Sequence, residues 1–211
     1  MPEFHAILEA KLADGDDMIE RAAAKLAGIL CNNRIIREED REIIAYGLDA
    51  LISTLINIVI IFAVGLLLGI FAQTVIFLLA FAALRVFAGG YHARTRVGCT
   101  ATFLVIYLAG MAVLKYTPAF AVKPAAAILA LASVGAVFLM APIEHPNRPF
   151  RDNEYQVFKR TSRITAIIET LLALAGIVLG YEMTAYCVSL AMLGVTIILA
   201  LAKKQKRGVI E

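Results

Sequence analysis

Residues 48–70 read LDALISTLINIVIIFAVGLLLGI, an apolar run in which Asp49 is the single charged side chain. About 20 consecutive apolar residues are needed to cross the hydrocarbon core of a bilayer as an α-helix. Further apolar runs follow and alternate with charged segments, so this stretch is expected to be the first of six spans. The other five spans are expected at residues 72–88, 98–114, 124–141, 164–180 and 183–202.

The composition of the chain agrees with a membrane protein. Of its 211 residues, 61% are hydrophobic and only 18% are charged, whereas soluble domains are about half apolar and about a quarter charged. No basic stripe interleaved with aromatic residues occurs, so a nucleic-acid partner is not expected. The predicted fold class is an all-α integral membrane protein with about six transmembrane helices, preceded by an N-terminal amphipathic helical region.

The N-terminal segment, residues 4–30, carries apolar residues at helical spacing and is expected to break at residues 14–17. Such a segment lies either in the membrane interface or, as an ordinary helix, against the bundle or a partner subunit. We expect residues 1–42 to form this cytoplasmic or interfacial region and residues 43–202 to form the six-helix transmembrane domain. Residues 203–211 are expected to be a basic cytoplasmic tail.

The placement of lysine and arginine predicts the orientation of the spans. Eighteen of the 20 basic residues lie before the first span, between spans two and three, between spans four and five, or after the sixth. The alternate loops hold only Lys115 and Lys123. Because cytoplasmic loops are enriched in basic residues, the chain is expected to be a multi-pass protein of the cell membrane with both termini in the cytoplasm.

One cytoplasmic segment combines a thiol with an imidazole: Arg85-Val-Phe-Ala-Gly-Gly-Tyr-His92-Ala-Arg-Thr-Arg-Val-Gly-Cys99. A cysteine protease needs these two groups within hydrogen-bond reach. On one continuous helix, His92 and Cys99 would be separated by about 10.5 Å of rise, so the chain must turn back between them. Three glycines permit such a turn, namely Gly89, Gly90 and Gly98.

Cys99 is expected to open the third spanning helix. A helix N-terminus stabilises negative charge, and Arg94 and Arg96 add a positive field, so both features favour the reactive thiolate. Backbone N–H groups at the same place could stabilise an oxyanion. From the spacing alone, an alternative stays open, in which Cys99 is a small packing residue and His92 has no chemical role.

The run Arg85…Gly-Gly-Tyr-His-Ala…Cys99 resembles the catalytic region of the accessory gene regulator B (AgrB) family, membrane endopeptidases that mature quorum-sensing peptides in Gram-positive bacteria. A second segment, Pro142-Ile-Glu-His-Pro-Asn-Arg-Pro149, resembles the loop after the fourth span in many members. Chain length, the charged amphipathic start and the six spans match as well. The resemblance therefore covers essentially the whole chain.

The resemblance implies a cysteine peptidase domain over residues 43–202 with its catalytic loop at residues 85–99. His92 would be the general base and Cys99 the nucleophile, while Arg85 and Gly90 match positions associated with activity. A membrane-associated precursor peptide would be cut at the cytoplasmic face through an acyl-enzyme thioester, which then closes to a thiolactone or lactone. No cofactor is expected. The expected partners are this peptide and the lipid bilayer, and a second copy of the chain, as a homodimer, is a candidate partner.

The loop after the fourth span and the basic residues near it have two interpretations. Glu144, His145 and Asn147 either orient His92, as a third group does in catalytic triads, or belong to a rigid connection locked by prolines. Carboxylates of the substrate are expected to meet Arg85, Arg94, Arg96 and the basic loop from Arg151 to Arg163. No metal site is expected, because Glu144-His145 lacks the second histidine of a helical zinc motif.

Polar residues inside the spans are also interpreted in two ways. Glu169 is either functional, as intramembrane acids often are, or pairs with Arg85 or Arg163. Asn57 and Gln73 are expected to form interhelical hydrogen bonds. Cys31 and Cys187 are expected to be structural.

Two competing functions are kept. A small non-enzymatic membrane transporter or scaffold would carry a polar stripe along several spans, and the sequence shows only scattered polar residues there. A lipid-head-group transferase would need clustered acids to hold a divalent metal, and no such cluster occurs in the expected spans.

Overall fold

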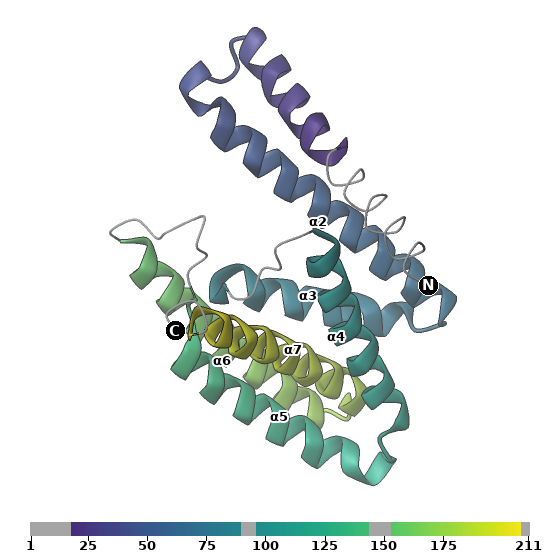
Figure 1. The fold of residues 1–211 in the computed structure, drawn as a ribbon. Helices are drawn as coiled ribbons and strands as arrows, with labels where there is room; N and C mark the ends of the chain where they lie inside the picture. The colour runs from purple at the N-terminus through teal and green to yellow at the C-terminus, as the bar shows by residue number, and fades with distance from the viewer. Residues whose placement is uncertain (1–17, 90–95, 144–152, 208–211) are drawn as a thin grey trace. The chain divides into compact units, whose positions relative to one another are not determined.

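The computed structural model describes residues 18–89, 96–143 and 153–207 (Figure 1). A helix over residues 18–32 and a short 3₁₀ turn at Glu38–Asp40 precede six long helices in these ranges. The long helices are α2 (Arg41–Leu67), α3 (Phe71–Ala88), α4 (Arg96–Tyr116), α5 (Ala119–Met140), α6 (Glu154–Val178) and α7 (Glu182–Arg207). The described residues form no strand.

Each of the six long helices contains a segment that is long and apolar enough to cross a membrane. The predicted fold class is therefore confirmed, and the chain is a multi-pass membrane protein. Several helices extend beyond the predicted spans, most of all α6, which begins at Glu154 and not near residue 164. A helix satisfies its own backbone hydrogen bonds, so it continues into the headgroup layer, where the apolar pattern that reveals a span has ended.

The start of α5 also differs from the prediction. The helix begins at Ala119, five residues before Pro124, which was expected to open the span. Pro118 precedes the helix with an extended backbone. Pro124 lies close enough to the start that it removes one backbone hydrogen bond without ending the helix.

Contacts divide the chain into two compact units. Unit 1 comprises Met1–Val64 and Ala93–Ala101, and unit 2 comprises Gly65–His92 and Thr102–Glu211. These units are defined by contacts between residues. The predicted regions, with boundaries at residues 42 and 202, were defined by amino-acid composition and stay predictions.

In unit 1, the helix over residues 18–32 runs antiparallel to the first part of α2 (Figure 1). It buries Ala23 and Ala27 completely or almost completely, and Cys31 contacts Glu38 at the turn between the two helices. The same helix exposes Met18, Leu26 and Ile29, so both interpretations of this segment stay open. Residues 1–17, where the predicted break lies, are outside the described residues.

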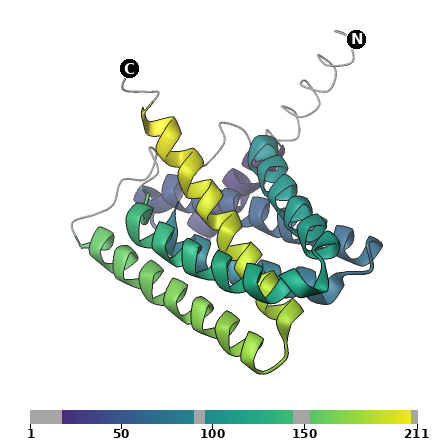
Figure 2. The ribbon, with the colours of Figure 1, turned by 90° about the horizontal axis from the view of Figure 1, so that it is seen from below.

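In unit 2, α7 is the central helix. It packs against α3, α5 and α6 (Figure 2), and most of its spanning length is buried. Small side chains line these contacts, which suits helices that associate in lipid through close backbone approach and not through a hydrophobic driving force. They include Ala126, Ala130, Ala166, Ala173 and Ala191.

The two ends of unit 2 are built from different sets of segments. At one end, Lys123 of α5 pairs with Glu182 of α7 at 2.9 Å, and Thr117 hydrogen-bonds the Tyr186 hydroxyl at 3.0 Å. At the other end, the C-termini of α3 and α5 meet the first turns of α6. Arg85 and Arg163 lie at this second end, and the orientation of the spans stays a prediction.

Candidate active site

Most of the predicted site lies outside the described residues: Gly90, His92, Arg94, Glu144 and Asn147. Arg96 is described as the first residue of α4, although its side chain is not. The pairing of His92 with Cys99 and the role of Glu144 or Asn147 therefore stay predictions. The described residues that flank them show how the chain enters and leaves the predicted catalytic loop.

Cys99 lies in the first turn of α4, which begins at Arg96. Its thiol is free and partly buried. This position agrees with the expectation that Cys99 stands at the start of a helix, where the helix dipole favours a thiolate. Gly98 was expected to help the chain turn, but it lies inside α4, so any reversal toward His92 must occur before Arg96.

A hydrogen bond fixes this first turn in unit 1. Thr100, the residue after Cys99, donates from Oγ1 to Oδ1 of Asn57 on α2 at 2.6 Å. The predicted interhelical role of Asn57 is confirmed. Because Thr100 is covalently next to the thiol, this contact restricts the position of Cys99 relative to α2.

The opposite border of the catalytic loop is the end of α3 in unit 2. Gly89 terminates the helix with a φ of 68° and a ψ of −150°, a conformation in which glycine avoids the strain met by other residues. The guanidinium of Arg85 donates from Nη1 to the Gly89 carbonyl. Arg85 thus caps the carboxyl end of α3, where a cation also compensates the helix dipole.

The second motif of the sequence begins against this same glycine. The amide of Ile143 donates to the carbonyl of Ala88 at 3.0 Å, and Gly89 and Ile143 form a parallel backbone bridge. His92 follows Gly89 by three residues, and Glu144 follows Ile143 directly. The segment that leads to His92 and the segment that begins at Glu144 therefore both leave unit 2 next to the Gly89–Ile143 bridge.

Helix α6 closes this end of unit 2. Phe158 contacts Phe87 with ring centroids 6.2 Å apart, edge to face. Arg163 donates to the carbonyl of Phe138 at 3.1 Å and stacks over its ring at 4.8 Å. Because both contacts lie near the Gly89–Ile143 bridge in sequence, the basic first half of α6 is held at the same end of the unit.

The two other cysteines have protein partners. Cys187 is fully buried in α7 and donates to the backbone carbonyl of Gln73 at 3.2 Å, as expected of a structural thiol. The predicted interhelical contact at Gln73 is thus made by its backbone. Cys31 donates to Glu38 at 2.7 Å. That hydrogen bond, followed by desolvation and the negative charge of Glu38, raises the pKa of the Cys31 thiol.

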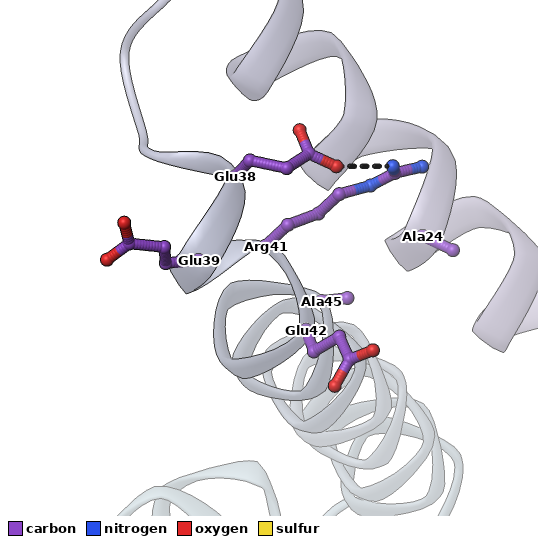
Figure 3. A pocket seen from close by; sticks show the side chains of 6 residues that line it. All are labelled: Ala24, Glu38, Glu39, Arg41, Glu42 and Ala45. Carbon is purple, nitrogen blue, oxygen red and sulfur yellow. Dashed lines mark hydrogen bonds and ion pairs between the residues drawn. The ribbon is translucent and has the colours of Figure 1, made fainter.

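A cavity of about 570 Å³ lies in unit 1 and is lined in part by Glu38, the hydrogen-bond partner of Cys31. Figure 3 shows Glu38 reaching Arg41, with which it forms an ion pair at 3.0 Å, while Glu39 points away from that pair. Three acidic residues and one arginine line this exposed groove together with Ala24 and Ala45. The sequence analysis did not select it, and it contains no residue of the predicted site.

Among the described residues, no group of three or more histidine, cysteine, aspartate or glutamate side chains is arranged to hold a metal ion. Glu169, the intramembrane acid, is 5% exposed, and neither carboxylate oxygen has a hydrogen-bond partner among these residues. The expected pairing of Glu169 with Arg85 or Arg163 is therefore wrong for the described structure.

The fold and the described borders of the site define a helical multi-pass membrane protein with a free thiol at the start of a helix. The sequence matches the family Accessory gene regulator B over residues 23–200, and the chain belongs to this family. This membership supports involvement in the agr quorum-sensing system and suggests a peptidase-like role.

Two relatives support the family assignment. An AgrB-like protein of Clostridium perfringens strain SM101 (Type A) is 28% identical over 186 residues, which cover 84% of this chain and 86% of that protein. A protein called AgrB-like protein 2, from strain 13 (Type A) of the same species, is 27% identical over 173 residues, or 78% of this chain and 80% of the relative. No solved structure matches the chain significantly.

The sequence analysis missed two residues that shape the borders of the site. Thr100 was overlooked because a threonine in an apolar helix usually bonds its own backbone, and no local pattern names a partner 43 residues away. Ile143 was quoted only as part of a motif. Its contact with Gly89 joins distant backbone segments, and the sequence analysis interpreted Gly89 and Gly90 only as residues that permit a turn.

Proposed function

We propose that the chain is a membrane cysteine endopeptidase that cleaves an autoinducer precursor peptide at the cytoplasmic face and promotes its cyclisation. Cys99 is the nucleophile and His92 the general base. The observation that carries this proposal is the position of Cys99 in the first turn of α4, in a chain whose family match spans residues 23–200. Both termini lie in the cytoplasm under this proposal.

The proposed reaction conserves the activated acyl group. His92 takes the proton of the Cys99 thiol, and the sulfur attacks the carbonyl carbon of the scissile peptide bond. The C–N bond breaks, His92 returns the proton to the leaving amine, and an acyl-enzyme thioester forms. A cysteine thiol or serine hydroxyl of the peptide then attacks the thioester, closes the ring and restores the Cys99 thiol.

The described borders of the loop support this chemistry in two ways. The first turn of α4 presents backbone amides that stabilise a thiolate and an oxyanion, and the Thr100–Asn57 hydrogen bond limits its movement. The Arg85–Gly89 contact and the Gly89–Ile143 bridge fix the other border. The proposal requires that His92 and Cys99 be held in a reactive geometry, which contributes strongly to catalysis.

The test is co-expression with a candidate precursor, to be chosen among neighbouring open reading frames as a short amphipathic peptide with an acidic C-terminal part. Cys99→Ala should abolish cleavage while membrane insertion stays normal, and Cys99→Ser should be nearly as damaging because a hydroxyl is harder to deprotonate. His92→Ala should also abolish cleavage. The wild type should accumulate an adduct with the precursor that hydroxylamine releases.

Cys31→Ala and Cys187→Ala are the matched controls, because each removes a thiol that the structure gives another partner. Both should insert and cleave. Normal cleavage by Cys99→Ala would end the peptidase proposal and favour the transporter or scaffold.

A further inference from the structure

Glu169 is a buried acid that the proposed chemistry does not use. It lies on the packed face of α6, with Ala166 and Ala173 one turn to either side. Along the helix axis it is about 9 Å from Arg163 and about 13.5 Å from the end of the helix at Val178, at 1.5 Å per residue. The carboxyl group is therefore well inside the span.

A second unpartnered polar group lies on the neighbouring helix. Ser133 of α5 is 1% exposed, and its hydroxyl has no hydrogen-bond partner among the described residues. Helices α5 and α6 pack side by side and antiparallel (Figures 1 and 2), and Arg163 contacts Phe138. Along the helix axes, Ser133 is about 7.5 Å from Phe138 on α5, and Glu169 is about 9 Å from Arg163 on α6. Because the helices are antiparallel, both distances run in the same direction from the Arg163–Phe138 contact, so the two groups lie at nearly the same depth.

On the three helices packed against α6, no ionisable group whose side chain is described is bonded to Glu169. On α5, Lys123 pairs with Glu182 of α7 at the far end. On α3, Arg85 contacts the Gly89 carbonyl. On α7, the Tyr186 hydroxyl forms a hydrogen bond with Thr117, and the Cys187 thiol donates to the backbone carbonyl of Gln73. Lys203 and Lys204 are exposed near the end of this helix.

The charged groups of α6 itself lie in its first half. Arg163 contacts Phe138, Lys159 stacks over Tyr155, and Arg160 is exposed. Glu154 lies in the first turn. None of these cations forms an ion pair with Glu169, and no described group donates a hydrogen bond directly to its carboxyl oxygens.

An unpaired carboxylate is strongly disfavoured in such a place, because neither lipid nor apolar side chains solvate its charge. A divalent metal would require six or more oxygen ligands or further acids, and the described residues offer one carboxyl and one hydroxyl. A proton needs no such shell. It converts the carboxylate to a neutral acid with one O–H donor.

We propose that Glu169 is a proton-binding site in the core of unit 2, at which a proton taken from solvent keeps α6 packed against α5 and α7. The neutral acid and the Ser133 hydroxyl are bridged by one buried water, which satisfies both groups. Loss of the proton places an unpaired charge between the helices and loosens their packing. The site is independent of the peptidase proposal, since none of its residues belongs to the predicted catalytic loop.

The experiment uses the full-length protein in nanodiscs of phosphatidylcholine and phosphatidylglycerol. Infrared spectra at neutral pH should contain a protonated-carboxyl C=O band that is lost in Glu169→Gln and kept in Glu182→Gln, an acid on α7 that pairs with Lys123. Ser133→Ala should keep the band but shift its frequency. A band unchanged in Glu169→Gln would show that Glu169 is ionised and would overturn the proposal.

Thermal unfolding gives a second readout. The midpoint of the wild type should fall as the pH rises from mildly acidic to alkaline, and Glu169→Gln, which resembles the neutral acid, should lose this component of the fall. Equal pH dependence in both proteins would overturn the proposal. If Glu169→Gln fails to insert, the infrared spectrum of Ser133→Ala tests the proposal instead. A carboxyl band at the wild-type frequency in that variant would overturn it.

Discussion

The carbonyl of Ile143 lies against the Cα atom of Gly89 and leaves no room there for a Cβ atom. Gly89 also has a positive φ of 68°, so two independent constraints require glycine at the end of α3. The contact joins the segment that leads to His92 with the segment that leads to Glu144. It is the described feature that relates the two sequence motifs most directly.

Gly89→Ala should therefore damage the protein more than a comparable change elsewhere. The backbone conformation of Gly89, with φ 68° and ψ −150°, costs an ordinary residue about 1–3 kcal/mol, and the clash with a backbone carbonyl adds to this. We expect precursor cleavage to fall at least tenfold, with a lower thermal midpoint in detergent. The matched control is Gly69→Ala, which has the same φ of 68° and open space around the new methyl group. Equal effects of the two substitutions would show that the Ile143 contact is unimportant.

The hydrogen bond between Thr100 and Asn57 should couple the start of α4 to α2. Interhelical hydrogen bonds in membranes average about 0.6 kcal/mol and reach about 1.7 kcal/mol. A double-mutant cycle of Thr100→Val and Asn57→Ala should give a coupling free energy in this range, measured by reversible unfolding in mixed micelles. Thr196→Val is the control, because that hydroxyl bonds only its own helix at Met192. A coupling free energy near zero would contradict the contact.

Cys31 should react slowly with alkylating reagents near neutral pH. The hydrogen bond to Glu38 raises the pKa of its thiol, and the thiolate is the reactive form. In a Cys99→Ala/Cys187→Ala background, Glu38→Gln should lower that pKa and increase the alkylation rate, so the rate–pH curve shifts to lower pH. Glu39→Gln, one residue further and pointing away from the pair (Figure 3), should leave the curve in place. A shift to higher pH in Glu38→Gln would contradict this account.

The orientation of the spans can be checked with fused reporters. Eighteen of the 20 basic residues lie in one set of segments, and the structure separates Lys123 and Thr117 from the end of unit 2 that holds Arg163. A reporter after Glu211 should be cytoplasmic, and a reporter near Thr117 should be external. Cytoplasmic activity at Thr117 would overturn the orientation.

The spans were predictable because lipid imposes a simple pattern on the sequence, a run of apolar residues about as long as the bilayer core is thick. The helix ends were less predictable. The segment from Glu154 to Arg163 is helical although polar, since helices continue into the interface without an apolar signal. The start of α5 was predicted too late for a related reason, because the helix tolerates the one backbone hydrogen bond that Pro124 cannot donate.

The candidate site was predictable only where the signal was local. The position of Cys99 near a helix start followed from the charged and glycine-containing segment before it. The partners of Asn57 and Gly89 could not be predicted from the sequence, because they depend on how distant segments pack. Glu169 was noticed as an acid within a span, but its lack of a partner is a property of the packed helices and not of the sequence around it.

The central position of α7 has a consequence for biogenesis. During synthesis, α3, α5 and α6 enter the membrane before α7. Until α7 is inserted, the surfaces with which these three helices contact it stay uncovered. Their alanine-rich faces, and the polar groups at Ser133 and Glu169, meet lipid or the insertion machinery during that interval. A premature stop within α7 would therefore not trim a peripheral element. It would leave three inserted helices without their common partner, as a natural substrate for membrane quality-control proteases.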